Sequence, residues 1–211
     1  MDNIIALFVF QIAVLVFSVV IHEVSHGAIA ERLGDPTARL LGRITLNPLK
    51  HLDPFGSFVV PVVLWFLSSG TFIIGWAKPV PFNPWNLKNP IAAAAKIAAA
   101  GPAANILIAL AFGIVVRFWY VFGPPQIFMF LFSIIVEINI LLAIFNLVPI
   151  PPLDGSKILY ALLPRNEAGA AVITFLERFG LWLLLLFIFF GFDFIVPIVQ
   201  FVFTLFTGLR L

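Results

Sequence analysis

Four apolar regions alternate with short polar stretches along the chain, and a fifth lies near its end. They are residues 4–21, 55–77, 91–116, 126–148 and 181–208. A helix rises about 1.5 Å per residue, so roughly 20 apolar residues are enough to cross a bilayer. Residues 4–21, 91–116 and 126–148 therefore predict transmembrane helices. The pattern indicates an all-α polytopic membrane protein built as a transmembrane helix bundle.

The first helix is expected to extend beyond its apolar run, from Ile4 to about Leu33. Gly-Asp-Pro at 34–36 ends it, because glycine and proline are typical just past a helix terminus. Residues 35–54 are polar and rich in turn signals, and a proline-rich loop follows at 78–90. These connections are expected to lie in water rather than in lipid.

The end of the chain is harder to interpret. Residues 166–180 look amphipathic, and 181–208 are apolar but contain glycine and proline, so this part predicts either one long span or a broken hairpin. We divide the chain into a core, 1–165, and a C-terminal part, 166–211, made of an amphipathic segment and a transmembrane helix or helical hairpin. A second soluble domain is not expected.

Composition supports a membrane protein and limits its chemistry. Of the 211 residues, 62% are hydrophobic and 10% are charged, and the mean hydropathy is +1.13, which is outside the range of soluble domains. The net charge of +2 is not concentrated enough to suggest nucleic acid. Since the chain has no cysteine, a metal site must use His, Asp, Glu or Asn. The start lacks a basic region before its apolar run and is expected to be a retained span rather than a signal peptide.

Three ionisable residues lie close together in the first predicted helix, in the sequence His-Glu-x-x-His. His22 and His26 are four residues apart, so their imidazoles share one helix face and can bind one Zn²⁺. Glu23 is placed to reach a water on that ion. Charged groups at this depth are costly and usually functional. The alternatives are a polar cluster that joins helices, or a helix end in water.

Other polar residues are weaker candidates for metal ligands. Glu137 and Asn139 lie inside the 126–148 segment and are expected to form bonds between helices. His51 lies in a turn, and we regard it as a reserve ligand or substrate contact.

Two further motifs accompany His22-Glu23-x-x-His26. They are Asn146-x-x-Pro-x-Pro-Pro-Leu-Asp154-Gly155 and Gly101-Pro102-Ala-Ala-Asn105. With all three in this order, the sequence resembles the site-2 protease family of intramembrane zinc metalloproteases, over roughly residues 10–165. The resemblance implies that His22, His26 and Asp154 bind one zinc ion per chain and that Glu23 is the general base. It makes Asn105 and Asn146 candidates for holding the substrate.

The implied function is a zinc-dependent intramembrane endopeptidase that hydrolyses peptide bonds within or next to transmembrane segments, through a zinc-bound water activated by Glu23. A catalytic zinc needs three protein ligands and one open position, which His22, His26 and Asp154 would satisfy. The partners are then a transmembrane protein substrate and membrane lipid. One alternative is a catalytically silent relative that binds membrane partners, and another is a divalent-metal transporter, although its polar residues would be spread over several depths.

The chemistry also constrains the membrane topology. If His26 and Asp154 bind one ion, an odd number of crossings separates the first helix from the 126–148 helix, so 55–77 is predicted to be a re-entrant hairpin that turns near Ser69. With this topology most cations lie near one face of the membrane, which the positive-inside rule identifies as cytoplasmic. They are Arg32, Arg39, Arg43, Lys50, Lys78, Lys88, Lys96, Lys157 and Arg165, whereas Arg117 lies near the other face. We therefore expect a multi-pass protein of the plasma membrane with its active site toward the cytoplasm.

Overall fold

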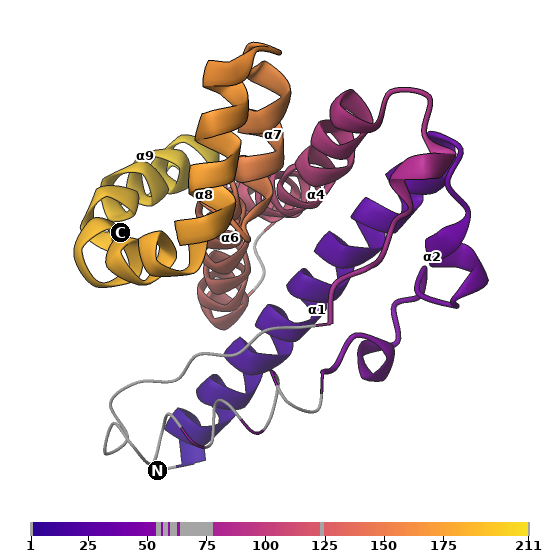
Figure 1. The fold of residues 1–211 in the computed structure, drawn as a ribbon. Coiled ribbons are helices and arrows are strands. Elements are labelled where there is room, and N and C mark those ends of the chain that lie inside the picture. Colours follow the sequence, from indigo (N-terminus) through magenta and orange to yellow (C-terminus); the bar gives the residue numbers. More distant parts are fainter. Residues whose placement is uncertain are drawn as a thin grey trace.

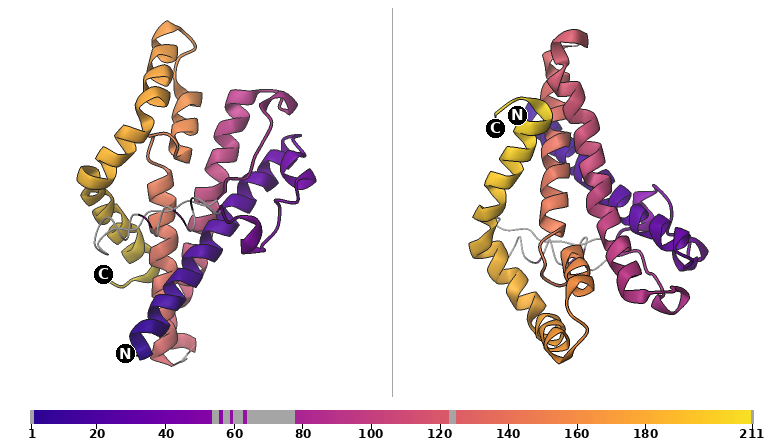
Figure 2. Two further views of the ribbon diagram at one scale, coloured as in Figure 1. Left: turned by 60° about the horizontal axis from the view of Figure 1, so that its bottom comes forward. Right: turned by 90° about the horizontal axis from the view of Figure 1, so that it is seen from above.

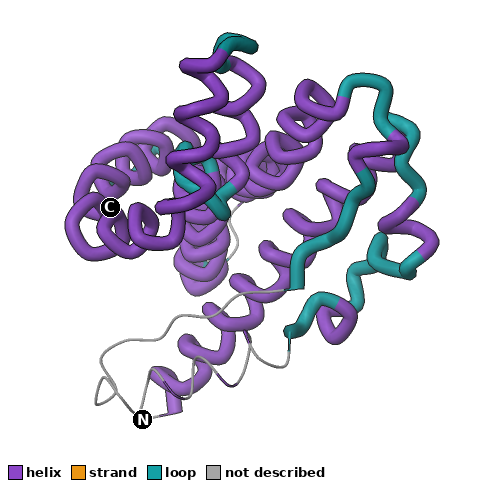
Figure 3. The backbone as a smooth tube through the Cα atoms, viewed as in Figure 1, coloured by secondary structure: helices purple, strands orange, loops and turns teal. Residues whose placement is uncertain are grey.

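The computed structural model describes residues 2–53, 78–122 and 125–210, together with Gly56, Val59 and Val63. These residues form helices joined by loops, and no strand occurs among them (Figures 1 and 3). The predicted all-α class is confirmed. The long helices are α1 (Asp2–Arg32), α4 (Pro90–Arg117), α6 (Gln126–Asn146), α8 (Glu167–Leu186) and α9 (Ile195–Thr207); the short ones are α2 (Thr37–Leu40), α5 (Trp119–Phe122) and α7 (Asp154–Leu162).

Four helical stretches in the described part of the chain are long and apolar enough to cross a membrane. They are Ile4–Arg32, Pro90–Arg117, Gln126–Asn146 and Glu167–Thr207. The first three match the predicted helices within a few residues, α6 ending two residues early because a tight turn begins at Leu147. The predicted hairpin at 55–77 lies outside the described residues, apart from three isolated positions.

Local capping explains where several helices begin and end. At α4 the Asn89 side chain accepts a hydrogen bond from the Ala92 amide, and Pro90 takes the first helical position, where a missing N–H does no harm. Helix α1 stops because Gly34 adopts a φ of 107°, a conformation that only glycine reaches readily. Asn166 caps α8 in the same way as Asn89 caps α4.

The centre of the bundle is formed by α1, α4 and α6, and α9 packs on α4 and α6 (Figure 2). The buried cluster between α4, α6 and α9 consists of Ala109, Val136, Ile140, Ile195, Val199 and Phe203. A second cluster, Ala30, Leu87, Ala93 and Ile97, joins the end of α1 to the start of α4. Large apolar side chains elsewhere on these helices, such as Phe8, Leu107 and Phe128, are exposed, as expected for surfaces that face lipid.

The C-terminal tail is one helical run of 41 residues with a break in its middle. A π-helical turn at Phe187–Gly191 and a 3₁₀ turn at Phe192–Phe194 separate α8 from α9, and the run bends there (Figure 2). Pro197 lies in the first turn of α9, where its missing N–H favours a break just before it. The amphipathic segment expected at 166–180 is the first part of α8.

Candidate metal centre

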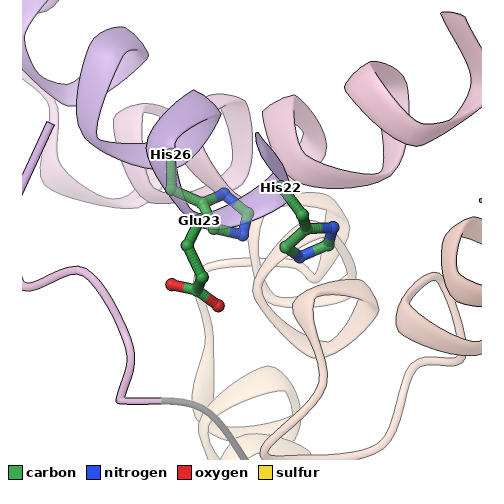
Figure 4. Close-up of side chains that lie close together, drawn as sticks. All are labelled: His22, Glu23 and His26. Atoms are coloured by element: carbon green, nitrogen blue, oxygen red, sulfur yellow. The ribbon is translucent and has the colours of Figure 1, made fainter. Parts of the chain in front are cut away.

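His22, Glu23 and His26 lie on one side of α1, and their side chains point the same way (Figure 4). The centroids of the two imidazole rings are 4.6 Å apart. One ligand atom from each of the three residues lies within 4.8 Å of the other two. The helical spacing of the motif therefore brings the two imidazoles and the Glu23 carboxylate close together.

Asp154 reaches this cluster from a distant part of the chain. It is the first residue of α7, and its Oδ2 lies 3.0 Å from Nε2 of His22 and 3.2 Å from Nε2 of His26. The preceding turn can direct Asp154 inward only because residue 155 is glycine. A Cβ atom at Gly155 would lie 2.2 Å from the Leu147 carbonyl oxygen. In the Leu-Asp-Gly sequence, the aspartate thus reaches the histidines and the glycine is required sterically.

The hydrogen bonds made by the two Nδ1 atoms indicate the tautomer of each histidine, and therefore which ring nitrogen is free to bind metal. His26 Nδ1 donates to the Ile97 carbonyl at 2.6 Å, and His22 Nδ1 donates to Asn105 Oδ1 at 2.6 Å. A histidine that binds metal is neutral and has one N–H, so in that state both Nε2 atoms are left as lone-pair acceptors.

Three electron-pair donors therefore meet at one point: the two Nε2 atoms and Oδ2 of Asp154. That oxygen is buried, and its closest polar neighbours among the described residues are the two Nε2 atoms. Buried acceptors that face one another repel unless a cation lies between them. Two imidazoles and one carboxylate are a ligand set of catalytic zinc, with a fourth position left for water. The residues present thus fit one zinc ion.

Helix α4 approaches the two histidines very closely at Gly101. A Cβ atom there would lie 2.5 Å from Nε2 of His22 and 2.6 Å from Cε1 of His26, which is closer than Cβ atoms in proteins approach atoms to which they are not bonded. Gly101 is therefore required sterically beside the metal centre. This explains the glycine of the Gly-Pro motif, whose role the sequence alone did not reveal.

Asn105 lies behind His22 in a buried polar network. Its amide nitrogen donates to Oδ1 of Asn139 at 2.9 Å and to the Ser18 carbonyl at 3.3 Å, while Asn139 donates to Oγ of Ser18 at 2.9 Å. Asn105 and Asn139 are both 0% exposed. The interhelical bonds expected of Asn139 are present, and they connect α1, α4 and α6 at the level of His22.

The remaining candidates lie elsewhere or are engaged differently. Asn146 is half-buried at the end of α6 and donates to the Leu142 carbonyl of its own helix at 2.9 Å. His51 is buried in its loop, where Nε2 lies 2.9 Å from the Thr45 carbonyl. Glu137 is exposed on α6.

Glu23 has a partner that the sequence did not suggest. Its Oε2 accepts a hydrogen bond of 2.8 Å from the backbone amide of Val80, in the proline-rich loop. This part of the loop runs beside α1 (Figure 1). No sequence signal identifies an amide for such a role, beyond the prolines at 79 and 81 on either side of Val80.

Comparison with known proteins agrees with these motifs. A model of peptidase family M50 matches residues 10–130 and 124–187. The Bacillus subtilis (strain 168) protein named "Putative zinc metalloprotease YwhC" is 35% identical over 177 residues, 81% of this chain and 76% of that protein. "Putative zinc metalloprotease Rip2" of Mycolicibacterium smegmatis is 30% identical over 183 residues, 82% of this chain and 68% of that protein.

A shorter match of 41% identity over 64 residues links the chain to "Putative zinc metalloprotease MJ0611" of Methanocaldococcus jannaschii, covering 30% of this chain and 32% of that protein. No solved structure matches the chain. With the family model covering most of the chain, and with four apolar helical stretches around a His-Glu-His cluster, the chain belongs to peptidase family M50, the site-2 protease family of zinc intramembrane proteases.

Proposed function

We propose that this protein is an active endopeptidase that hydrolyses peptide bonds within or next to transmembrane segments of membrane proteins. The observation that carries this proposal is the convergence of His22, His26 and Asp154 on one point, with Glu23 beside them. A structural relic would have no need to keep three acceptors facing one another. The arrangement therefore supports an active catalytic centre over a silent relative.

In this proposal His22, His26 and Asp154 hold one zinc ion per chain. When bound, zinc acts as a Lewis acid that acidifies water and polarises a peptide carbonyl. Glu23 accepts the proton of the attacking water and returns it to the leaving amine. Because Oε2 of Glu23 is engaged by the Val80 amide, we assign the proton transfer to Oε1.

The two asparagines receive different roles. The amide of Asn105 is bonded to His22, Asn139 and Ser18, so we propose that it orients His22 rather than holding substrate. Asn146 keeps the role of a substrate contact, because it is the last residue of α6, just before the turn that leads to Asp154. An extended substrate backbone has unpaired donors and acceptors, and an amide side chain can satisfy one of each.

The orientation in the membrane follows from the same site. The end of α1, the start of α4 and the end of α6 lie together, since His26 contacts Ile97 and Asp154 follows α6. Exposed cations near these ends include Arg32, Lys88 and Lys96, whereas Arg117 lies at the far end of α4. We propose that the metal centre lies toward the cytoplasmic side of the plasma membrane.

The test is cleavage of a single-span model substrate by purified protein in detergent, with zinc content measured on the same samples. Wild type should cut within or beside the span, and Glu23→Gln should lose at least about a hundredfold in rate while retaining zinc. Glu31→Gln is the matched control, because Glu31 lies on the same helix in an ion pair with Arg39. If Glu23→Gln cleaves as fast as wild type, or if wild type with zinc cleaves nothing, the proposal is wrong.

A further inference from the structure

The proline-rich loop has few backbone N–H groups that could donate a hydrogen bond to Glu23. Pro79 and Pro81 have no N–H, so Val80 supplies the one backbone donor between Lys78 and Phe82. That donor goes to Oε2 of Glu23 at 2.8 Å. Val80 is 8% exposed, and its Cγ1 lies against Gly27 of α1, where a Cβ atom would be 3.0 Å away. The segment is therefore held tightly against the helix that carries the site.

Arg43 fixes the beginning of this segment. Its guanidinium donates to the carbonyls of Lys78 at 2.7 Å and Pro79 at 3.4 Å, and to the carbonyl of Lys50. The Lys78 amide in turn donates to the His51 carbonyl at 2.8 Å. One side chain thus ties two separate loop segments together, immediately before Val80.

The surroundings of Arg43 are unusual for a cation. The residue is 9% exposed, and the contacts described for its guanidinium are to backbone carbonyls rather than to a carboxylate. Burying a charge is expensive unless its geometry is specific and its hydrogen bonds are made. Arg39, four residues earlier, shows the ordinary alternative, since it is exposed and paired with Glu31.

We infer that Arg43 is a positioning residue for the reaction: by holding the Lys78 and Pro79 carbonyls, it directs the Val80 amide onto Glu23 and so orients the carboxylate that moves the proton. Arg43 itself touches neither the metal ligands nor Glu23 in the contacts described. The inference rests on the proposed function for its kinetic consequence. The structural part of the inference, that Arg43 holds the Val80 amide in place, can be tested without substrate turnover.

The experiment compares wild type, Arg43→Gln, Arg43→Lys and Arg39→Gln, the last being a matched arginine outside the site. Each purified protein is assayed for zinc content, for kcat and KM on the model substrate, and for hydrogen exchange of the peptide covering residues 78–83. In Arg43→Gln we expect kcat to fall about 10- to 100-fold through misplacement of a catalytic group, with KM and zinc content within twofold of wild type.

The Val80 amide should exchange about tenfold faster in Arg43→Gln, as the loss of a charge-assisted hydrogen bond implies. Arg43→Lys should recover part of both effects, and Arg39→Gln should match wild type.

Unchanged kcat would overturn the inference. A fall in kcat that only follows lost zinc, while the Val80 amide stays protected from exchange, would overturn it as well. If Arg43→Gln does not fold, Arg43→Lys is judged by the same criteria. If wild type cleaves nothing, the proposed function fails, and amide exchange alone decides: equal protection in wild type and the Arg43 variants overturns the role of Arg43.

Discussion

At Gly101, helix α4 lies so close to the two histidines that a methyl group there would overlap with them. We predict that Gly101→Ala displaces His22 and His26 and weakens zinc binding by about tenfold or more, since overpacking costs about 1–3 kcal/mol. Zinc affinity measured by chelator competition checks this. Ala103→Ser adds one heavy atom on the exposed side of the same helix and should bind zinc like wild type. Full zinc affinity in Gly101→Ala would show that the close approach is not required.

Asn105 and Asn146 were both candidates for holding the substrate, but their contacts predict different effects. Asn105→Ala removes the acceptor of His22 Nδ1, and loss of such a partner lowers metal affinity about 10- to 100-fold. Asn146→Ala removes a bond within its own helix, so zinc content should be unchanged and KM for the model substrate should rise. Parallel zinc titrations and kinetics of the two variants separate the roles. Equal zinc affinity in both would contradict the assignment of Asn105.

The candidate metal ligands were predictable, whereas the residues that contact the candidate site from other elements were not. His22 and His26 follow from helical spacing, because residues four apart share a face in any helix. The contacts of Asn105 with His22 and of Val80 with Glu23 join positions far apart in the chain. They depend on how α4 is rotated against α1 and on the path of a loop, and neither leaves a periodic signal in one sequence.

At the scale of elements, apolar runs predicted α1, α4 and α6 because a bilayer sets both the length and the composition of a helix that crosses it. The break between α8 and α9 was harder to predict. Gly191 and Pro197 marked a weak point in residues 181–208, yet either one long span or a broken hairpin was compatible with them. The packing of α9 on α4 and α6 accompanies the bend.

The connection between α1 and the 3₁₀ turn at Pro84–Asn86 depends on the buried carboxylate of Asp35. Its oxygens accept hydrogen bonds from Thr37, from the Asn83 amide at 2.6 Å and from the Asn86 side chain at 2.7 Å. Burial alone would raise the pKa of Asp35, but these hydrogen bonds outweigh it and hold the pKa below its usual 3.8. The folded state therefore binds the proton more weakly than the unfolded chain does.

Because the pKa of Asp35 is lowered by folding, its contribution to stability is complete above pH 3.8 and is lost as the pH falls through the folded pKa. We predict that Asp35→Asn is less stable than wild type at pH 6, by about 1–3 kcal/mol, and that the difference narrows at the acidic end. Thermal unfolding in detergent from pH 6 to pH 3 measures this. Asp193→Asn, at an exposed position, should keep the acid response of wild type, and a constant gap between Asp35→Asn and wild type would refute the prediction.

For the whole molecule, the candidate metal site limits how many times the chain can cross the membrane between His26 and Asp154. His26 bonds to the start of α4, and Asp154 follows the end of α6. The end of α1 and the end of α6 therefore lie on the same side of the bilayer. With one crossing by helix α4 between them, residues 55–77 are expected to add either no crossing or two. A run of 23 residues with Pro61 inside it is too short for two crossings, since each needs roughly 20 residues.

We therefore predict that residues 55–77 enter and leave the membrane on the cytoplasmic face, turning near Ser69. The chain has no cysteine, so single cysteines can be labelled with a membrane-impermeant maleimide without interference. Trp85→Cys, at a 93% exposed position of the proline-rich loop, should label from the cytoplasmic side, and Gln126→Cys, at the start of α6, from the outer side. Ser69→Cys should follow Trp85→Cys. Labelling of Ser69→Cys from the outer side alone would mean that this region crosses, and the shared depth of His26 and Asp154 would then require another crossing in the chain between them.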